Sequence, residues 1–303
     1  MTTRRSFIGT LTGGLLAAPL AAEGKPAAKI ARIGFLETNR AASPHTPEAF
    51  RQGLRDLGYV EGRNLVIEYR DAEGKPERFP ALATELVALK VDVIVASSQL
   101  SALAAKQATR TLPIVFATAA DPVARGLVTS LARPGGNLTG SSNLAPELAS
   151  KGLEHLKQAV PGVTRVAVLW HPGGLGERTE KDTLKGAEVA ARALGVRLQF
   201  VEARGPEDFD RAFSEMTRAR ASALTLCLGS PMLFAERRRL VDLAAKNRLP
   251  AVYPVREFVD AGGLMSYGPD QADLNRRAAT YVDISKHVGR VKSESIVVDE
   301  IAV

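Results

Sequence analysis

Residues 91–122, VDVIVASSQLSALAAKQATRTLPIVFATAADP, contain the clearest indication of the fold. This stretch begins with a short apolar run rich in β-branched residues and contains a second run, LPIVFATA, and both are typical of buried strands. Between the two runs, residues 101–109 have the pattern of a helix. A strand, a helix and a strand in this order predict two parallel strands joined by a helical crossover.

The same alternation continues on both sides of this stretch. On the N-terminal side, the predicted strands ARIGFLE and NLVIEYR alternate with helices over 47–57 and 76–89. On the C-terminal side, TRVAVLW, VRLQFVEA, ALTLCLG and LPAVYPV alternate with helices over 177–194, 206–220 and 231–247. This rhythm predicts an α/β fold in which helices cover both faces of parallel sheets.

The two halves of the chain resemble each other. EGKPERFPALATEL around Pro76 corresponds to ARGPEDFDRAFSEM around Pro206, and each places proline and acidic residues at the start of a helix. AKQATRTLPIVF corresponds in the same way to AAKNRLPAVY. We therefore predict two similar doubly wound, Rossmann-like lobes joined by a hinge, with a ligand cleft between them at the carboxyl ends of the strands.

A segment typical of an export signal precedes the first predicted strand. MTTRRSFIGTLTGGLLAAPLAAEGKP has basic residues at Arg4 and Arg5, an apolar centre over 7–16 and a small-residue end. The apolar run is too short and too weak for a membrane-spanning helix, and the arginine pair is similar to a twin-arginine signal. We expect residues 1–28 to be signal and spacer, with cleavage after Ala22, and the mature protein to lie in the periplasm.

Composition and motifs exclude several classes of function. One cysteine in 303 residues allows neither an internal disulfide nor a cysteine-based metal site, and the four histidines lack metal-ligand spacing. The net charge of +7 is not focused into a basic stripe with stacking aromatics, so we predict no nucleic-acid binding. HPGGLGER does not satisfy the dinucleotide-binding pattern and LGSPM is not a nucleophile elbow, so we expect no catalytic residues, cofactor or metal.

Three long segments resemble one known family. They are FRQGLRDLGYVEGRNLVIEYRDAEGKPERFPALATELVALKVDVIVA, AAKQATRTLPIVFATAADPVARGLVTSLARPGGNLTG and RRLVDLAAKNRLPAVYPVREFVDAGGLMSYGPD. In these segments the chain is similar to ABC-transporter substrate-binding proteins of the tryptophan/tyrosine type, which have the periplasmic-binding-protein type I fold. The resemblance implies a monomeric, soluble receptor that captures a small organic solute, delivers it to a membrane permease and catalyses nothing. A small-molecule enzyme or sensor domain on the same fold is the alternative, because fold does not dictate function.

The chain departs from the family pattern at three places. SSQ at 97–99 stands where a Gly-Thr-like turn is usual, and GSP at 229–231 lacks the acidic residue of a common Gly-Asp-Pro. The end, ISKHVGRVKSESIVVDEIAV, does not resemble the family's last strand and helix. We predict the first lobe over 29–142 and 268–285, the second lobe over 143–267, and an atypical tail, truncated or altered in reading frame, over 286–303.

Polar residues follow three predicted strands of the first lobe, and we predict that they face the cleft: Glu37, Thr38, Ser97, Ser98, Gln99, Thr118 and Asp121. The hydroxyls of Ser97 and Ser98, together with the amides of the helix that follows, form a cradle suited to a carboxylate. Asp121 is a candidate partner for an amino group. Each of these residues has an alternative role as a loop residue or helix cap.

The candidates in the second lobe are Trp170, Ser230, Tyr253 and Arg256. The single tryptophan follows a strand and is suited to stacking on a ring, although large aromatic residues also build cores. Arg256 can bind a carboxylate with two parallel hydrogen bonds or lie exposed on a helix. The family name suggests an aromatic amino acid as ligand, with its carboxylate at Ser97 and Ser98, its ammonium near Asp121, and its ring against Trp170 or Tyr253.

Overall fold

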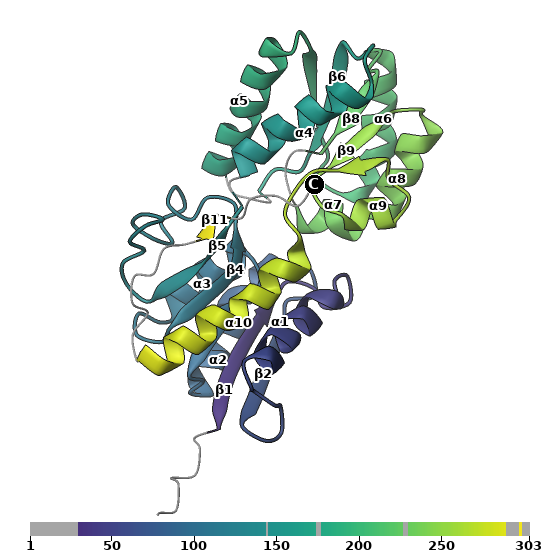
Figure 1. Cartoon of the computed structure of the whole chain (residues 1–303). Helices are drawn as coiled ribbons and strands as arrows, with labels where there is room; N and C mark the ends of the chain where they lie inside the picture. Colours follow the sequence, from purple (N-terminus) through teal and green to yellow (C-terminus); the bar gives the residue numbers. More distant parts are fainter. Residues whose placement is uncertain (1–29, 144, 174–176, 227–229, 289–296, 299–303) are drawn as a thin grey trace, which may run out of the picture.

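The computed structural model describes residues 30–143, 145–173, 177–226, 230–288 and 297–298. These residues form two lobes, each built around one parallel sheet with helices on its faces (Figure 1). The strands of the first sheet are β1 (Ala31–Glu37), β2 (Leu65–Asp71), β3 (Val93–Ala96), β4 (Ile114–Ala119), β5 (Leu138–Ser142) and β11 (Val297–Val298).

The second sheet repeats the topology of the first. Its strands are β6 (Arg165–Trp170), β7 (Arg197–Glu202), β8 (Ala223–Thr225), β9 (Ala251–Tyr253) and β10 (Met265–Ser266). Its order is β10-β9-β8-β6-β7, which matches β5-β4-β3-β1-β2 of the first sheet strand for strand. The predicted pair of similar, doubly wound lobes is therefore confirmed.

The helices occupy the positions that the sequence pattern predicts, with two differences. The helices predicted over 76–89 and 206–220 each begin with a short 3-10 turn, η1 (Pro76–Arg78) or η2 (Pro206–Asp208), because proline and acidic residues open them. The helix predicted over 231–247 is two helices, α7 and α8, separated at Glu236. The α-helices are α1 (His45–Asp56), α2 (Phe79–Ala88), α3 (Gln99–Ala108), α4 (Ala145–Ala159), α5 (Glu177–Ala193), α6 (Phe209–Arg218), α7 (Pro231–Ala235), α8 (Arg237–Lys246), α9 (Glu257–Asp260) and α10 (Gln271–Val288).

Both faces of the first sheet are buried, as the continuous apolar run in VDVIVA predicts. Val93 and Val95 pack on one face with residues of α1 and α10, and Ile94 and Ala96 pack on the other with residues of α2 and α3. This division follows from the period of two along a strand, which sends successive side chains to opposite faces. The sheet therefore lies in the middle of the lobe, and only its ends are open to a ligand.

Helix α10 returns from the second lobe and lies beside α1 across the first (Figure 1). The two helices approach closely at Gly53, where a Cβ atom would overlap the carbonyl oxygen of Arg276. The hydroxyl of Tyr59 donates a 2.6 Å hydrogen bond to the carboxylate of Asp283 and holds the later part of α10 in place. The chain thus passes between the lobes more than once, so the two lobes are joined by more than one segment.

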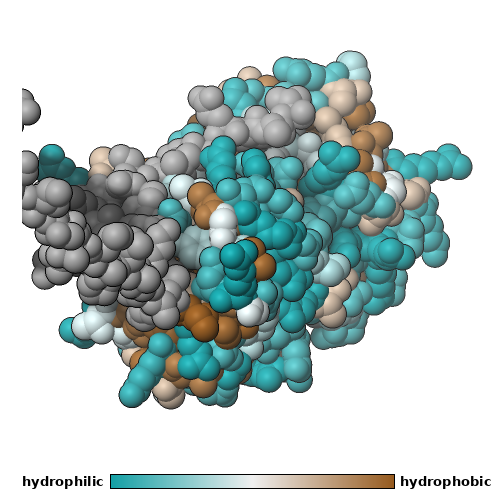
Figure 2. Space-filling view, turned by 60° about the horizontal axis from the view of Figure 1, so that its bottom comes forward, coloured by the Kyte–Doolittle hydropathy of each residue, from teal (hydrophilic) through white to brown (hydrophobic). Residues whose placement is uncertain are grey.

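The predicted export segment, residues 1–28, lies outside the described residues, and so does most of the predicted atypical tail. Within that tail, β11 pairs in parallel with β5 at the edge of the first sheet. None of the helices in the described part of the chain combines the length and apolar character that crossing a membrane requires. In the view of Figure 2, most of the described surface is hydrophilic and hydrophobic residues show in small groups.

Candidate functional site

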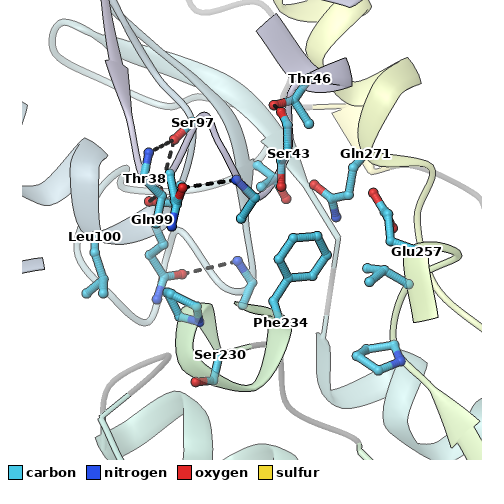
Figure 3. Close-up of a pocket in the computed structure, with 18 of the residues that line it drawn as sticks. Thr38, Ser43, Thr46, Ser97, Gln99, Leu100, Ser230, Phe234, Glu257 and Gln271 are labelled. Atoms are coloured by element: carbon cyan, nitrogen blue, oxygen red, sulfur yellow. Dashed lines mark hydrogen bonds between the residues drawn. The ribbon is translucent and has the colours of Figure 1, made fainter. Parts of the chain in front are cut away.

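A cavity of about 250 Å³ lies between the lobes, at the carboxyl ends of the strands. The first lobe contributes the residues after β1, β3, β4 and β5 together with the starts of α1 and α10, and the second contributes α7, α9 and the loop after β9. Its volume is small beside the roughly 300–1,000 Å³ of pockets for drug-sized molecules. The cavity therefore suits a small ligand that contacts both lobes (Figure 3).

Three hydroxyl groups form a network where β1 and β3 end. The Thr38 amide donates to Ser97 Oγ at 3.1 Å, and Thr38 Oγ1 lies 3.2 Å from Ser97 Oγ and 3.1 Å from Ser98 Oγ. Ser98 also caps α3, because its Oγ accepts from the Ser101 amide while Ser101 Oγ accepts from the Ser98 amide. Ser98 therefore has the two roles that the sequence left open: it caps a helix and it lines the cavity.

Gln99 joins α3 to the turn that follows β4. Its side chain is buried, and its Oε1 accepts hydrogen bonds from the amides of Ala120 and Asp121 at 3.1 and 3.2 Å. Both bonds fix the path of the chain directly after β4. The start of α3, from Ser98 to Leu100, borders the cavity, and its helix dipole favours negative charge there (Figure 3).

Glu37 is a buried carboxyl group in the cavity wall. Burial raises its pKa to about 7, and the nearby Asp71 carboxylate acts in the same direction, whereas the Arg40 guanidinium acts against this shift. Arg40 Nε lies 3.3 Å from Glu37 Oε2, and the Arg40 guanidinium also stacks over the ring of Tyr69 at 3.8 Å. The protonation state of Glu37 therefore changes near neutral pH.

The second lobe presents an aromatic wall that Phe234 of α7 dominates. Phe234 projects into the space between Gln99 and Gln271 (Figure 3). Its ring packs edge-to-face with the ring of Phe258, and the two ring centroids are 6.3 Å apart. Ser230 caps α7 through the Leu233 amide, and its Oγ lies 3.0 Å from Nδ1 of His171. Burial lowers the pKa of His171, which favours the neutral imidazole.

Side chains of the two lobes touch beside the cavity. His45 at the start of α1 lies 2.8 Å from the carboxylate of Glu257 at the start of α9. Arg237 of α8 donates to the carbonyl oxygen of Ala42 at 3.3 Å. Both contacts join the two lobes at the border of the cavity.

Four of the predicted site residues are not among the residues that line the cavity: Asp121, Trp170, Tyr253 and Arg256. Asp121 caps the turn after β4 by accepting from the Ala124 amide at 2.8 Å. Trp170 packs between the second sheet and its helices, beside Ala149 and Leu184.

The other two are held away from the cavity by their neighbours. Tyr253 stacks on Phe258 with ring centroids 4.8 Å apart and lines a neighbouring cavity of about 100 Å³. Arg256 points into solvent with its side chain 82% exposed and pairs with Asp260 on its own helix. The remaining predicted residues line the larger cavity: Glu37, Thr38, Ser97, Ser98, Gln99, Thr118 and Ser230.

Sequence reasoning missed several lining residues because they come from helices or from the loop before α1 and not from strand ends: Ser43, Thr46, Phe234, Glu257, Gln271 and Asn275. The pattern of α10 could have revealed Asn275, since it is a polar residue on a buried helical face and only 2% exposed. The other polar residues of this set are of kinds that are common on protein surfaces.

The described lining contains acidic residues and no basic ones. Its ionisable residues are Glu37 and Glu257, and it contains no Lys, Arg or His. Within the described ranges, no three His, Cys, Asp or Glu side chains are grouped so that they could hold a metal ion. The chemistry available to a ligand here is hydrogen bonding, charge and apolar contact.

Two lobes with one strand order, and a cavity lined by both at the ends of their strands, are the architecture of the periplasmic-binding-protein type I fold. The chain belongs to the family of ABC transporter substrate binding proteins, whose model matches residues 30–288. Members of this family bind solutes and are not enzymes, which agrees with the expectation of no catalytic residues.

Known proteins resemble the chain at moderate identity. A tyrosine-binding protein of Clostridioides difficile (strain R20291) is 26% identical over 239 residues, which is 76% of this chain and 65% of the relative. The chain thus matches slightly less than two thirds of that relative's length. A conserved domain protein of Vibrio cholerae is 26% identical with a TM-score of 0.81, and an ABC domain from Streptococcus pneumoniae in complex with L-Trp is 22% identical with a TM-score of 0.79. Each comparison covers 90% of both chains.

Proposed function

We propose that this chain is the solute-binding component of an ABC importer and that it captures a small organic solute between its lobes. The observation that carries the proposal is the cavity that both lobes line at the carboxyl ends of their strands. Open α/β sheets bind ligands at this edge, and a ligand that touches both lobes stabilises the closed form. The hinge lies where the chain crosses between the predicted lobes, near 142–143 and 267–268.

The ligand that fits this wall best is an aromatic amino acid. The start of α3, with the hydroxyls of Ser97 and Ser98, is suited to a carboxylate. Phe234 and Phe258 offer an apolar surface to a ring. The relative from C. difficile that binds tyrosine and the S. pneumoniae structure that contains L-Trp support the same class of ligand.

The protein performs this function outside the cytoplasmic membrane. Arg4 and Arg5, followed by an apolar run and small residues, support export through a cleaved signal. The lobes close on the ligand by a hinge motion. The closed form with its ligand then docks on a membrane permease and delivers the ligand to it. Each of these steps extends the function of the family to this chain.

Thermal unfolding of the signal-free protein tests this function. The panel consists of tyrosine, tryptophan, phenylalanine, aliphatic amino acids, benzoate and sugars. A ligand at 100 times its Kd adds about 2.7 kcal/mol to the free energy of unfolding, and a shift of the midpoint by a few degrees is expected with the aromatic amino acids. A cooperative transition that no compound moves contradicts the proposed function, and a shift with sugars alone contradicts the proposed ligand.

A further inference from the structure

Four oxygen atoms in the cavity wall are buried and have no hydrogen-bond partner among the described residues: Glu37 Oε1, Thr118 Oγ1, Asn143 Oδ1 and Asn275 Oδ1. Buried polar atoms are nearly always paired, because leaving one unpaired loses the hydrogen bond that water would supply. A group of such atoms around one cavity therefore indicates a donor that arrives with the ligand.

Three of these oxygens belong to elements that meet at one side of the cavity. Thr118 lies at the end of β4, Asn143 directly follows β5, and Asn275 lies in the early part of α10, which packs on both strands. The Asn275 amide nitrogen donates to the Gln271 carbonyl at 2.8 Å. This bond fixes the orientation of the amide group and leaves its oxygen as the unpaired acceptor.

We propose that Thr118, Asn143 and Asn275 hold the ammonium group of the ligand; this inference rests on the proposed function and names the subsite that selects for an amine. A primary ammonium carries three N–H donors, which matches three oxygen acceptors. The Glu257 side chain adds an acidic group to a described lining that has no cationic side chain. A carboxylate at this place could accept from the Thr118 hydroxyl, but it would meet only acceptors in the Asn143 and Asn275 oxygens.

The strand register places this subsite beside the carboxylate cradle. Ala96 of β3 pairs with Phe116 of β4, so Ser98 and Thr118 each lie two residues beyond the same pair. Neighbouring strands are about 4.8 Å apart. A carboxylate at Ser98 and an ammonium at Thr118 are therefore one strand apart, which is compatible with the short spacing of these groups in an α-amino acid. Asp121, the predicted partner of the amine, caps the turn after β4 instead.

Matched ligands separate the amine from the rest of the molecule. Isothermal titration of the signal-free protein compares L-tyrosine with tyramine, which lacks the carboxylate, and with 3-(4-hydroxyphenyl)propionate, which lacks the amine; L-tryptophan, tryptamine and indole-3-propionate form the second set. We expect each propionate to bind roughly 100-fold or more weakly than its amino acid, because a site built for N–H donors rejects an analogue without them. We expect the amines to retain part of the affinity.

Paired variants distinguish the loss of a contact to the ammonium group from a general loss of protein stability. Thr118→Val removes the hydroxyl from the cavity wall, and we expect a roughly 10-fold loss of affinity for the amino acid with little change for the propionate. Thr139→Val is the control, because Thr139 Oγ1 is also buried and unpaired but does not line the cavity. Asn275→Leu removes a second acceptor, and we expect the same selective loss.

The results of these titrations test the ammonium subsite and the solute-binding function separately. Propionates that bind as tightly as the amino acids overturn the ammonium subsite and leave the solute-binding function standing. The same holds if Thr118→Val and Asn275→Leu leave the ratio of the two affinities unchanged, since water then pairs the oxygens. An equal loss in Thr118→Val and Thr139→Val means a structural effect and also overturns the inference. A folded protein that binds no compound of either set or of the wider panel overturns both the subsite and the proposed function.

Discussion

His45 and Glu257 are 212 positions apart in the sequence, and the His45 Nε2 atom lies 2.8 Å from a carboxylate oxygen of Glu257. The two residues belong to different lobes, at the start of α1 and the start of α9. Glu257 also lines the cavity, whereas His45 is exposed outside it. The pair therefore links the two lobes beside the cavity.

Breaking this pair is expected to weaken ligand binding by a modest factor. A hydrogen bond between partly exposed side chains contributes about 1 kcal/mol, and since this one joins the two lobes that line the cavity, we expect His45→Ala or Glu257→Gln to lower affinity by up to about 5-fold. A double-mutant cycle with L-tyrosine in titration calorimetry measures the coupling. Asp260→Asn is the control, because Asp260 pairs with Arg256 on its own helix. If the effects of the two substitutions on affinity are additive, the pair between the lobes does not contribute to binding.

Substitutions at Ser98 are expected to separate helix capping from carboxylate binding. Asp caps a helix as well as Ser does, so Ser98→Asp retains most of the stability of α3 but brings a negative charge to the cradle. We expect at least about a 10-fold loss of tyrosine affinity, with a change in the free energy of unfolding below about 1 kcal/mol.

Ser101→Ala is the matched control for Ser98. It removes the second hydroxyl of the capping box, but Ser101 does not line the cavity. Chemical denaturation should show a loss of about 1 kcal/mol, and calorimetry should show unchanged tyrosine affinity. Unchanged affinity in Ser98→Asp would instead leave Ser98 as a cap alone.

Glu37 is expected to make stability depend on pH in an unusual direction for a carboxyl group. Its pKa is raised to about 7 from 4.5, so the folded protein holds a proton in this window that the unfolded chain has released. The stability associated with this group is complete below about pH 4.5 and is lost as the pH rises through about 7. The full span corresponds to a loss on the order of 3 kcal/mol.

Comparison with Glu37→Gln isolates this effect from the other carboxylates. The free energy of unfolding of the wild-type protein relative to the variant should fall between pH 4.5 and pH 7. Glu77→Gln removes an exposed carboxylate from η1 and is the control. Parallel pH profiles of wild type and Glu37→Gln, measured by urea denaturation, would show that Glu37 does not titrate in this range.

Gly140 is expected to tolerate no side chain. Its φ angle is +157°, and a Cβ atom there would overlap the carbonyl oxygen and ring of Phe116 on β4. The register of β4 and β5 is irregular between Phe116 and Ala119, next to Thr118. We expect Gly140→Ala to reduce the free energy of unfolding by about 2–4 kcal/mol.

Gly162 provides the control for this substitution. A Cβ atom at Gly162 meets nothing within 4 Å, so Gly162→Ala should change stability by less than about 0.5 kcal/mol. Chemical denaturation measures both variants. A Gly140→Ala protein as stable as wild type would mean that β4 and β5 shift apart without loss, contrary to the tight packing of the sheet.

Local sequence patterns were enough to predict the two lobes. The apolar run around Val93 and Val95 has the length and composition of a strand buried on both faces, and the repeated proline starts at Pro76 and Pro206 show the internal duplication. Polar residues directly after a strand, such as Thr38 and Ser98, were also predictable. In a parallel sheet, the strand ends meet at one edge whatever the details of packing.

Strand ends alone could not distinguish a cavity residue from a cap. Asp121 and Ser98 both follow strands and both cap, yet only Ser98 lines the cavity. Trp170 ends its strand as well, but helices α4 and α5 cover it. Which side of a strand end faces the cleft depends on the turn that follows, and turns are set by contacts with other elements.

The order of strands and helices, the doubling of the lobe and the edge of each sheet where the cavity lies all follow from the sequence, because they depend on short-range periodicity and on the geometry of parallel sheets. The cavity that Phe234, Glu257 and Asn275 share with Thr118 depends on the tertiary structure. The first three come from helices of both lobes, and no local pattern encodes how two lobes pack on each other. The contact between His45 and Glu257 is likewise a property of the folded molecule.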